Sequence, residues 1–248
     1  MVPAISVRGV TKTYSEGSSQ VPALQGVDLD VEPGEVVLLM GPSGSGKTTL
    51  LSIMGCILRA TSGSVQLSGR EVAGLSEREL PAIRLANIGF VFQGFNLFPT
   101  LTAGENVELA LDLKKIRGAQ AKREARRLLE HVGLADKCHT FPSDLSGGQK
   151  QRVDIARALA ASPKLILADE PTAALDSHTG HHVMRTMRDL AHQHGRAVVV
   201  VTHDNRMLEF GDRIVPMEDG RIVERAVGSA LPNLLPQTAA SLGQYGSV

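Results

Sequence analysis

The sequence Gly41-Pro42-Ser43-Gly44-Ser45-Gly46-Lys47-Thr48 follows an almost wholly aliphatic run, residues 35–40, and leads into a helical pattern over residues 47–56. It matches the pattern G-x-x-x-x-G-K-[ST] at every fixed position. The glycines allow consecutive backbone N–H groups to curve around phosphate oxygens, and the N-terminus of the following helix points its positive end at them. The order strand, loop, helix therefore predicts an α/β core that binds a nucleotide through its phosphates.

Individual residues of this loop have separate predicted roles. Lys47 adds a full positive charge beside the phosphates, and the hydroxyl of Thr48 is suited to hold Mg²⁺. A dinucleotide-binding fold is excluded because the third glycine of G-x-G-x-x-G would fall on Thr49. The loop residues predicted to contact the nucleotide are Gly41, Pro42, Ser43, Gly44, Ser45, Gly46, Lys47, Thr48 and Thr49.

A second apolar run, residues 165–168, ends in two adjacent carboxylates, Asp169 and Glu170. A buried strand that delivers two acids to its carboxyl end is costly unless a cation and a bound water use them. Asp169 is suited to contact Mg²⁺ directly or through water, and Glu170 is suited to orient and polarise the water that attacks a γ-phosphate. The alternative is that the two acids simply end the strand at a solvent-exposed surface. The presence of a complete phosphate loop makes this alternative the weaker interpretation.

A second candidate phosphate site is Leu145-Ser146-Gly147-Gly148-Gln149, which precedes a helical pattern rich in Arg, Ala and Leu. Its serine and glycines stand where a helix N-terminus presents free N–H groups. Because one nucleotide needs only one phosphate cradle, the second cradle predicts a site that is completed across a dimer. Taken alone, the segment also fits a plain helix cap. The predicted nucleotide contacts here are Ser146, Gly147, Gly148 and Gln149.

The remaining apolar runs predict a mixed α/β fold. Buried-strand patterns at residues 88–92 and 197–202 join the two runs described above, and together they predict a mostly parallel sheet covered by helices on both faces. Two β-like runs at residues 4–10 and 25–31, separated by turn-forming residues at 15–19, predict an antiparallel β portion at the N-terminus.

The domain organisation follows from the same patterns. Residues 102–161 show helical periodicity without a strand pattern, and we interpret them as an inserted helical subdomain. Short runs on either side of Asp219-Gly220 predict a hairpin at the end of the main domain, which spans residues 4–225. Residues 226–248, with several Gly, Ser and Pro, predict a flexible C-terminal tail.

The composition excludes some classes of function. Lys and Arg together equal Asp and Glu at 26 each, and only 3% of the residues are aromatic, so we expect no nucleic acid partner. The longest apolar runs, such as residues 197–201, are far shorter than the roughly 18 to 20 residues that cross a bilayer. The N-terminus lacks the basic start and apolar centre of a secretory signal, so we expect the chain to stay in the cytosol.

Taken in order, the phosphate loop, Leu145 to Gln149 (the signature segment) and Leu165 to Glu170 resemble the ATPase domain of ABC transporters. The resemblance covers about residues 4–225 and implies a phosphate-loop NTPase fold, ATP hydrolysis, ATP and Mg²⁺ as ligands, and a homodimer of ATPase subunits. It implies that Ser43 makes a further contact in the phosphate loop.

The same resemblance implies roles for residues outside these motifs. Tyr14 would stack on adenine, Gln93 would link Mg²⁺ and the attacking water to the membrane partner, and Asp176 would lie at the dimer seam. His203 would lie near the γ-phosphate. The predicted catalytic residues are Lys47, Gln93, Glu170 and His203, and the predicted Mg²⁺ ligands are Thr48, Gln93 and Asp169.

Within the family, the chain is similar to the lipoprotein-release, macrolide-efflux and cell-division group (LolD/MacB). Pro171 to Asp176 and Thr202 to Arg206 look more like the DevA-type ATPases of glycolipid exporters. The resemblance implies an FtsX/MacB-like or DevC-type permease, a periplasmic adaptor protein, and a peripheral place at the cytoplasmic face of the plasma membrane. Asp154 departs from the family pattern, in which the helix after the signature segment usually carries Ala.

Two functions remain open on this basis. In the first, ATP closes a homodimer, closure pushes on separate membrane subunits, and hydrolysis resets the cycle of export. In the second, a cell-division type of signalling complex uses the same parts to regulate a wall enzyme without carrying cargo. A soluble ABC protein of DNA repair or translation would need a long coiled coil, zinc hooks or a second ATPase domain, and the sequence contains none of them.

Four of the six phenylalanines lie between positions 90 and 98: Phe90, Phe92, Phe95 and Phe98. The first two alternate along a strand and are expected to be buried, whereas Phe95, Leu97 and Phe98 fall in a loop where apolar side chains would meet water. We interpret residues 95–102 as part of a groove for a cytoplasmic helix of the permease. The alternative is that these side chains cover the helical subdomain.

Overall fold

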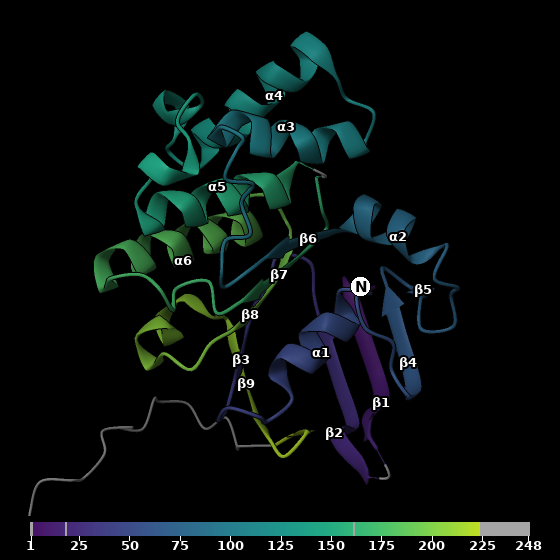
Figure 1. Cartoon of the computed structure of the whole chain (residues 1–248). Helices are drawn as coiled ribbons and strands as arrows, with labels where there is room; N and C mark the ends of the chain where they lie inside the picture. Colours follow the sequence, from purple (N-terminus) through teal and green to yellow (C-terminus); the bar gives the residue numbers. More distant parts are fainter. Residues whose placement is uncertain (1, 18, 161, 224–248) are drawn as a thin grey trace, which may run out of the picture.

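The computed structural model describes residues 2–17, 19–160 and 162–223, whose strands form two sheets (Figure 1). The first sheet is four-stranded, in the order β2-β1-β4-β5, and the second is six-stranded, in the order β10-β9-β3-β8-β7-β6. The first contains β1 (Ile5–Glu16), β2 (Ser19–Val31), β4 (Ser62–Leu67) and β5 (Arg70–Glu71). The second contains β3 (Val36–Met40), β6 (Ile88–Val91), β7 (Leu165–Asp169), β8 (Ala197–Val201), β9 (Arg213–Glu218) and β10 (Arg221–Ile222).

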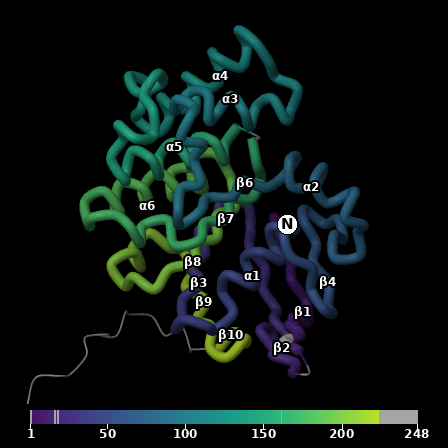
Figure 2. The backbone as a smooth tube through the Cα atoms, viewed as in Figure 1, coloured from purple at the N-terminus to yellow at the C-terminus, as the bar shows by residue number. Residues whose placement is uncertain are grey.

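Helices cover both faces of the larger sheet. The helices of the described residues are α1 (Lys47–Met54), α2 (Leu80–Asn87), α3 (Ala103–Leu113), α4 (Gly118–His131), α5 (Gly147–Leu159) and α6 (Ser177–His192), with 3₁₀ turns η1 (Ala135–Lys137), η2 (Pro142–Asp144) and η3 (Asn205–Phe210). Helix α1 lies between the two sheets, and α5 and α6 lie on the opposite face of the larger one. Figure 2 shows the chain leaving β6, forming α3 and α4 at the top of the molecule, and returning through α5 to β7.

The central strands are parallel and buried on both faces. β3 pairs with β8 and β9, and β7 pairs with β6 and β8, all in parallel. Alternate side chains of β3 enter two cores: Val36 and Leu38 join the core under α3 to α6, whereas Val37 and Leu39 join the core around α1. The apolar run is therefore continuous in sequence, as expected for a strand covered on both sides.

The predicted fold class is confirmed. The N-terminal portion is antiparallel, with β1 paired to β2, and β9 and β10 form the predicted hairpin. β1 is longer than its predicted run because its register with β2 shifts between Val7 and Val10, and such an irregularity interrupts the alternation that marks a strand. The strands β4 and β5, which complete the antiparallel sheet, were not predicted from the sequence.

The predicted domain limits stay a prediction, and the tail at residues 226–248 lies outside the described residues. The segment interpreted as a helical subdomain contains α3, α4 and α5 and no strand within its described part. Among the helices that the structure describes, none is both long and apolar enough to cross a membrane.

Candidate nucleotide site

Four neighbouring parallel strands end at one edge of the larger sheet, and the segment after each of them contributes to one pocket of about 580 Å³. Strand β3 leads to the phosphate loop, β6 to Gln93, β7 to Asp169 and Glu170, and β8 to His203. Parallel strands place their carboxyl ends together, which is why residues far apart in sequence meet here. The pocket is lined by Ala23, Gly41, Pro42, Ser43, Gly44, Gly46, Lys47, Thr48, Thr49, Gln93, Asp169, Glu170, Val201 and His203.

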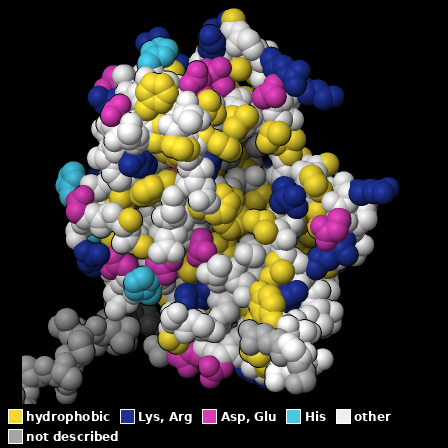
Figure 3. All heavy atoms as spheres, viewed as in Figure 1, with side chains coloured by type: hydrophobic (Ala, Val, Ile, Leu, Met, Phe, Trp, Pro, Cys, Tyr) yellow, Lys and Arg dark blue, Asp and Glu magenta, His cyan; other side chains and the backbone are white. Residues whose placement is uncertain are grey.

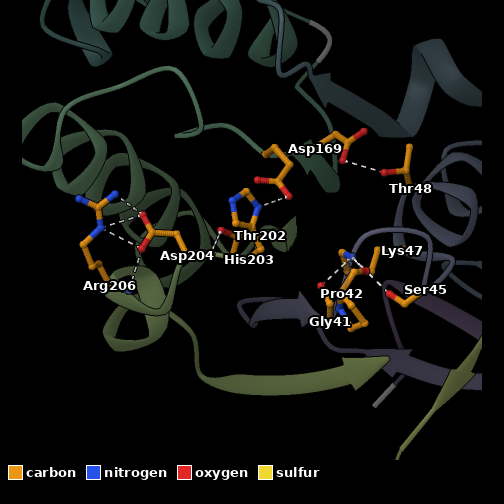
Figure 4. Close-up of polar contacts among 11 residues, drawn as sticks. Gly41, Pro42, Ser45, Lys47, Thr48, Asp169, Thr202, His203, Asp204 and Arg206 are labelled. Atoms are coloured by element: carbon orange, nitrogen blue, oxygen red, sulfur yellow. Dashed lines mark hydrogen bonds and ion pairs between the residues drawn. The ribbon is translucent and has the colours of Figure 1, made fainter. Parts of the chain in front are cut away.

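Lys47 is the cation of this pocket. Its Nζ donates hydrogen bonds to the carbonyls of Gly41, at 2.9 Å, and Pro42, at 2.7 Å, and to Ser45 Oγ at 3.2 Å (Figure 4). Burial lowers the pKa of Lys47, and the nearby carboxylates of Glu170 and Asp169 act in the opposite direction. The loop therefore holds a partly desolvated ammonium group where a phosphate would lie.

Two glycines of the loop are required by close contacts. At Gly46, with φ of 97°, a Cβ atom would lie 2.6 Å from the carbonyl oxygen of Ala23 in β2. At Gly41, a Cβ atom would lie 2.0 Å from the carbonyl oxygen of Met217 in β9. The loop is thus packed against both sheets, and a side chain at either position would displace it.

Two carboxylates lie at the carboxyl end of β7. Asp169 Oδ1 accepts a hydrogen bond of 3.1 Å from Thr48 Oγ1, which connects β7 to the start of α1 (Figure 4). Burial raises the pKa of Asp169 above its usual value. Glu170 Oε1 lies 2.8 Å from His203 Nδ1, so the strand ends of β7 and β8 are joined through their side chains.

A scan of family models places residues 24–173 in the ABC transporter family. A relative from Thermotoga maritima, an uncharacterized ABC transporter ATP-binding protein, is 51% identical and covers 86% of this chain and 91% of its own length. The chain belongs to the ABC transporter family. As an ATP-binding cassette of that family, it is an ATP hydrolase.

Two further comparisons agree with this assignment. A solved dimeric structure of a post-hydrolysis state of an ATP-binding cassette, bound to ADP and Pi, is 46% identical, covers 89% of this chain and 97% of its own, and has a TM-score of 0.82. A macrolide export ATP-binding/permease protein MacB of Agrobacterium fabrum is 46% identical over 99% of this chain. This ABC chain spans only 38% of that relative's length.

The signature segment of this ABC cassette lies outside the pocket. Ser146 begins α5 as its N-cap: its hydroxyl accepts from the backbone N–H of Gln149, and the Gln149 side chain accepts from the backbone N–H of Ser146. Gly147 and Gly148 form the first turn of the helix. In a single copy, the Ser146 side chain therefore acts as a plain helix cap. The backbone N–H groups of the two glycines lie at the positive end of the α5 dipole.

Three other predicted residues also lie outside the lining of the pocket. Asp176 caps α6, because it accepts from the backbone N–H of Thr179 at 3.0 Å. Tyr14, 39% exposed on β1, pairs with Val21 of β2, and Lys12 Nζ lies 5.3 Å from the centre of its ring. Ser45 is buried and accepts from Lys47 instead of lining the cavity.

Sequence reasoning missed several residues at the site. Ala23 and Val201 line the pocket, and no chemical feature of these apolar residues could have indicated it. Arg206 forms an ion pair with Asp204, next to His203 (Figure 4). Its Nη1 also donates to Ser177 Oγ. The His203 segment is therefore tied to the first residue of α6. Only the spacing of Asp204 and Arg206, two positions apart in the sequence, could have suggested an ion pair.

Proposed function

We propose that this chain is the ATP-hydrolysing subunit of an export complex, that it works as a homodimer, and that closure of the dimer on ATP drives a separate membrane permease. The observation that carries the proposal is that the two helix starts predicted to bind phosphate, those of α1 and α5, do not line the same pocket. The pocket at the start of α1 is lined by no residue of the signature segment, which opens α5. A nucleotide in that pocket would need a second copy to supply the signature segment.

The relatives support this arrangement. One solved relative is a dimeric cassette bound to ADP and Pi. The macrolide export relatives combine an ATP-binding part and a permease in one protein, and this chain covers only 38% and 35% of the length of two of them. We propose that the permease is a separate chain and that this ATPase subunit lies peripherally at the cytoplasmic face of the plasma membrane. The macrolide export relatives favour export over the signalling alternative.

We assign the roles in hydrolysis from the geometry of the pocket. Glu170 would orient and polarise the attacking water, and His203, at 2.8 Å, would hold the carboxylate in position. Lys47 and the N–H groups of the phosphate loop would bind the phosphates. In the dimer, Ser146 to Gln149 of one copy would complete the site of the other, with Asp176 at the seam between them.

The same pocket fits a Mg²⁺ ion that is bound together with the nucleotide. Thr48 Oγ1 and Asp169 Oδ1 are 3.1 Å apart, and Gln93 lines the same cavity. Mg²⁺ is usually held by one or two carboxylates together with substrate phosphates, and within the described ranges no group of three His, Cys, Asp or Glu side chains forms a dedicated cage. Thr48, Gln93 and Asp169 would hold the ion, which when bound neutralises phosphate charge.

The loop after Gln93 supports a contact with the permease. Phe98 is 49% exposed, yet its backbone is held on both sides by the buried Asn106, which accepts from Phe98 N at 2.8 Å and donates to Phe98 O at 3.2 Å. Leu97 packs against the core under α3 to α6, as the alternative interpretation expects. Hydrophobic side chains gather on this face below α3 and beside β6 (Figure 3). We propose that Phe98 contacts a cytoplasmic helix of the permease, with a periplasmic adaptor as a further component.

A mixed dimer tests the shared site. Lys47→Ala should remove phosphate binding in one copy, and Ser146→Arg should block the signature segment that faces the other. Each variant alone has two defective composite sites. A mixed dimer has one site with both defects and one with neither, so the mixture should recover ATPase activity that neither parent has.

The control is a mixture of two separately prepared Lys47→Ala samples, which should show no recovery. Hydrolysis at the full rate by monomers, kept apart at low concentration and identified by light scattering, would disprove the shared site.

A further inference from the structure

Asp154 is a charged residue in the interior of α5. Its side chain has no exposure, and it forms an ion pair one turn along the helix with Arg157, whose side chain is 15% exposed. Burial raises the pKa of Asp154 to about 6, against the opposing effect of Arg157. A buried ion pair is weak evidence for stability because its desolvation offsets its attraction. A contribution to the stability of the fold therefore does not explain why this pair is present.

Both side chains bind the backbone that follows β6. Asp154 Oδ2 accepts from the backbone N–H of Phe92 at 2.9 Å. Arg157 Nη2 donates to the carbonyl of Phe95 at 2.9 Å, and its Nη1 donates to the carbonyl of Asn96. The pair thus holds residues on both sides of Gln93, a residue that lines the nucleotide pocket.

The segment held in this way has a strained backbone. Phe95 has φ of 61° and Asn96 has φ of 48°, values that a residue with a side chain rarely adopts. Conformations of this kind persist only where the surroundings hold them. The two carbonyls that Arg157 binds belong to these same two residues. The hydrogen bonds from Arg157 therefore hold the part of the backbone that is strained.

We propose that Asp154 and Arg157 are positioning residues for ATP hydrolysis, forming a latch between α5 and residues 92–96 that keeps Gln93 at the nucleotide pocket. This inference rests on the proposed role of Gln93. Because α5 begins at the signature segment, the latch makes the start of that helix and Gln93 move as one unit. The helix that would face the second copy is thereby connected to the pocket of its own copy.

The test measures steady-state hydrolysis and backbone protection on the purified full chain. Asp154→Ala should lower kcat by about tenfold and leave KM for Mg-ATP within about twofold, because displacement of a positioned group acts on the reaction rather than on phosphate binding. Hydrogen exchange at the Phe92 amide should become faster. Asp154→Asn keeps an oxygen acceptor for Phe92 N and should recover most of both losses.

Arg152→Gln is the matched control. Arg152 lies on the same helix and binds the carbonyl of Val132 at 3.0 Å, away from the Gln93 segment. Loss of this contact should leave kcat and the Phe92 exchange rate unchanged. An equal fall in kcat for Arg152→Gln and Asp154→Ala would overturn the latch, because it would mean that any weakening of α5 has the same effect.

Gln93→Ala separates the latch from the role on which it rests. If Gln93→Ala lowers kcat and adding Asp154→Ala lowers it no further, the latch acts through Gln93 as proposed. If the double variant loses the full product of both effects, or if Asp154→Ala alone leaves kcat unchanged, the latch is wrong while the role of Gln93 stands. If Gln93→Ala itself leaves kcat unchanged, the proposed role of Gln93 fails and the inference fails with it.

Discussion

Glu170 follows β7 with φ of 49°, a left-handed backbone conformation that few residues other than glycine adopt. Its backbone N–H donates to the carbonyl of Val201 at 3.0 Å, so the strained residue is held against β8. The same turn brings its carboxylate to His203 at 2.8 Å. Strain of this kind is concentrated at functional sites, where the surrounding structure over-determines it.

At this residue, we predict that Glu170→Gln keeps ATP binding and loses turnover. The amide preserves the shape of the side chain but removes the carboxylate that would polarise water, and such a group contributes about 100- to 10,000-fold to a rate. Steady-state kcat should therefore fall by at least about 100-fold, and a nucleotide-dependent dimer should accumulate in size-exclusion chromatography with ATP.

Glu209→Gln is the matched control for this change. Glu209 Oε1 lies 3.9 Å from His181 Nδ1, so it is also a glutamate beside a histidine, but it is outside the pocket. Its substitution should leave kcat unchanged. Turnover by Glu170→Gln close to that of the unmodified protein would remove Glu170 from its proposed role.

Helices α5 and α6 pack very closely against each other at their N-terminal ends. A Cβ atom at Gly148 would lie 2.0 Å from Thr179 Cγ2, a distance that real Cβ atoms do not show. Gly148 is thus needed for this close packing within one copy, whatever it contacts in a dimer. The motif predicts that Gly148 binds phosphate, but it does not reveal this role in packing.

We predict that Gly148→Ala lowers the free energy of unfolding by about 1 to 3 kcal/mol, the usual range for overpacking. Urea denaturation of the purified chain would measure it. Gly147→Ala is the control, because the nearest atom to its Cβ, Leu175 Cδ2, would be at 3.5 Å, an ordinary contact. In a helix, Ala is favoured over Gly by up to about 1 kcal/mol, so this variant should be neutral or slightly more stable.

Thr179→Ser gives a second arm for the same prediction. It removes the Cγ2 atom that the new Cβ would meet and keeps the hydroxyl that donates to Asp176 at 2.6 Å. Adding Thr179→Ser to Gly148→Ala should therefore restore a large part of the lost stability. A double variant that is as unstable as the sum of the two single variants would show that this contact is not the cause.

Among the exposed side chains, Phe98 is the one that we expect to matter most when this chain assembles into a larger complex. Its side chain is 49% exposed while its backbone is fixed by the buried Asn106. An aromatic side chain presented on a fixed backbone loses little conformational entropy on binding, which favours its use in an interface. The two hydrophobic cores that support the fold do not include it.

We predict that Phe98→Ala leaves the isolated chain folded, with basal hydrolysis unchanged, and weakens its assembly with the permease. Truncation of a buried interface aromatic often costs about 2 kcal/mol or more, roughly a 30-fold loss of affinity. Recovery of the identified permease with the tagged chain, from solubilised native membranes, would measure the loss.

Ile57→Ala is the control for this assembly, because Ile57 is similarly exposed, at 54%, on the connection that follows α1. Its truncation should leave recovery of the permease unchanged. If Phe98→Ala instead lowers the free energy of unfolding of the isolated chain by about 3 kcal/mol, as for a core phenylalanine, the proposed contact with the permease is wrong.

The local motifs of this chain could be predicted because their chemistry is contained in a few consecutive residues. The phosphate loop, the acids at the carboxyl end of β7 and the cap of α5 each combine a backbone shape and a side-chain function within one segment. The meeting of the phosphate loop and the two acids in one pocket could also be anticipated, since the buried apolar runs indicated parallel strands. Parallel strands bring their carboxyl ends to the same edge.

Contacts between distant segments could not be predicted in this way. Asp154 lies 62 positions from the Phe92 amide that it binds, and Thr179 lies opposite Gly148 only because α5 and α6 pack together. In the sequence, Asp154 was a departure from a pattern with no known consequence. Sequence patterns report the chemistry and periodicity of single segments, whereas the angle and depth at which segments pack depend on all the side chains between them, so only the tertiary structure decided which of these residues meet.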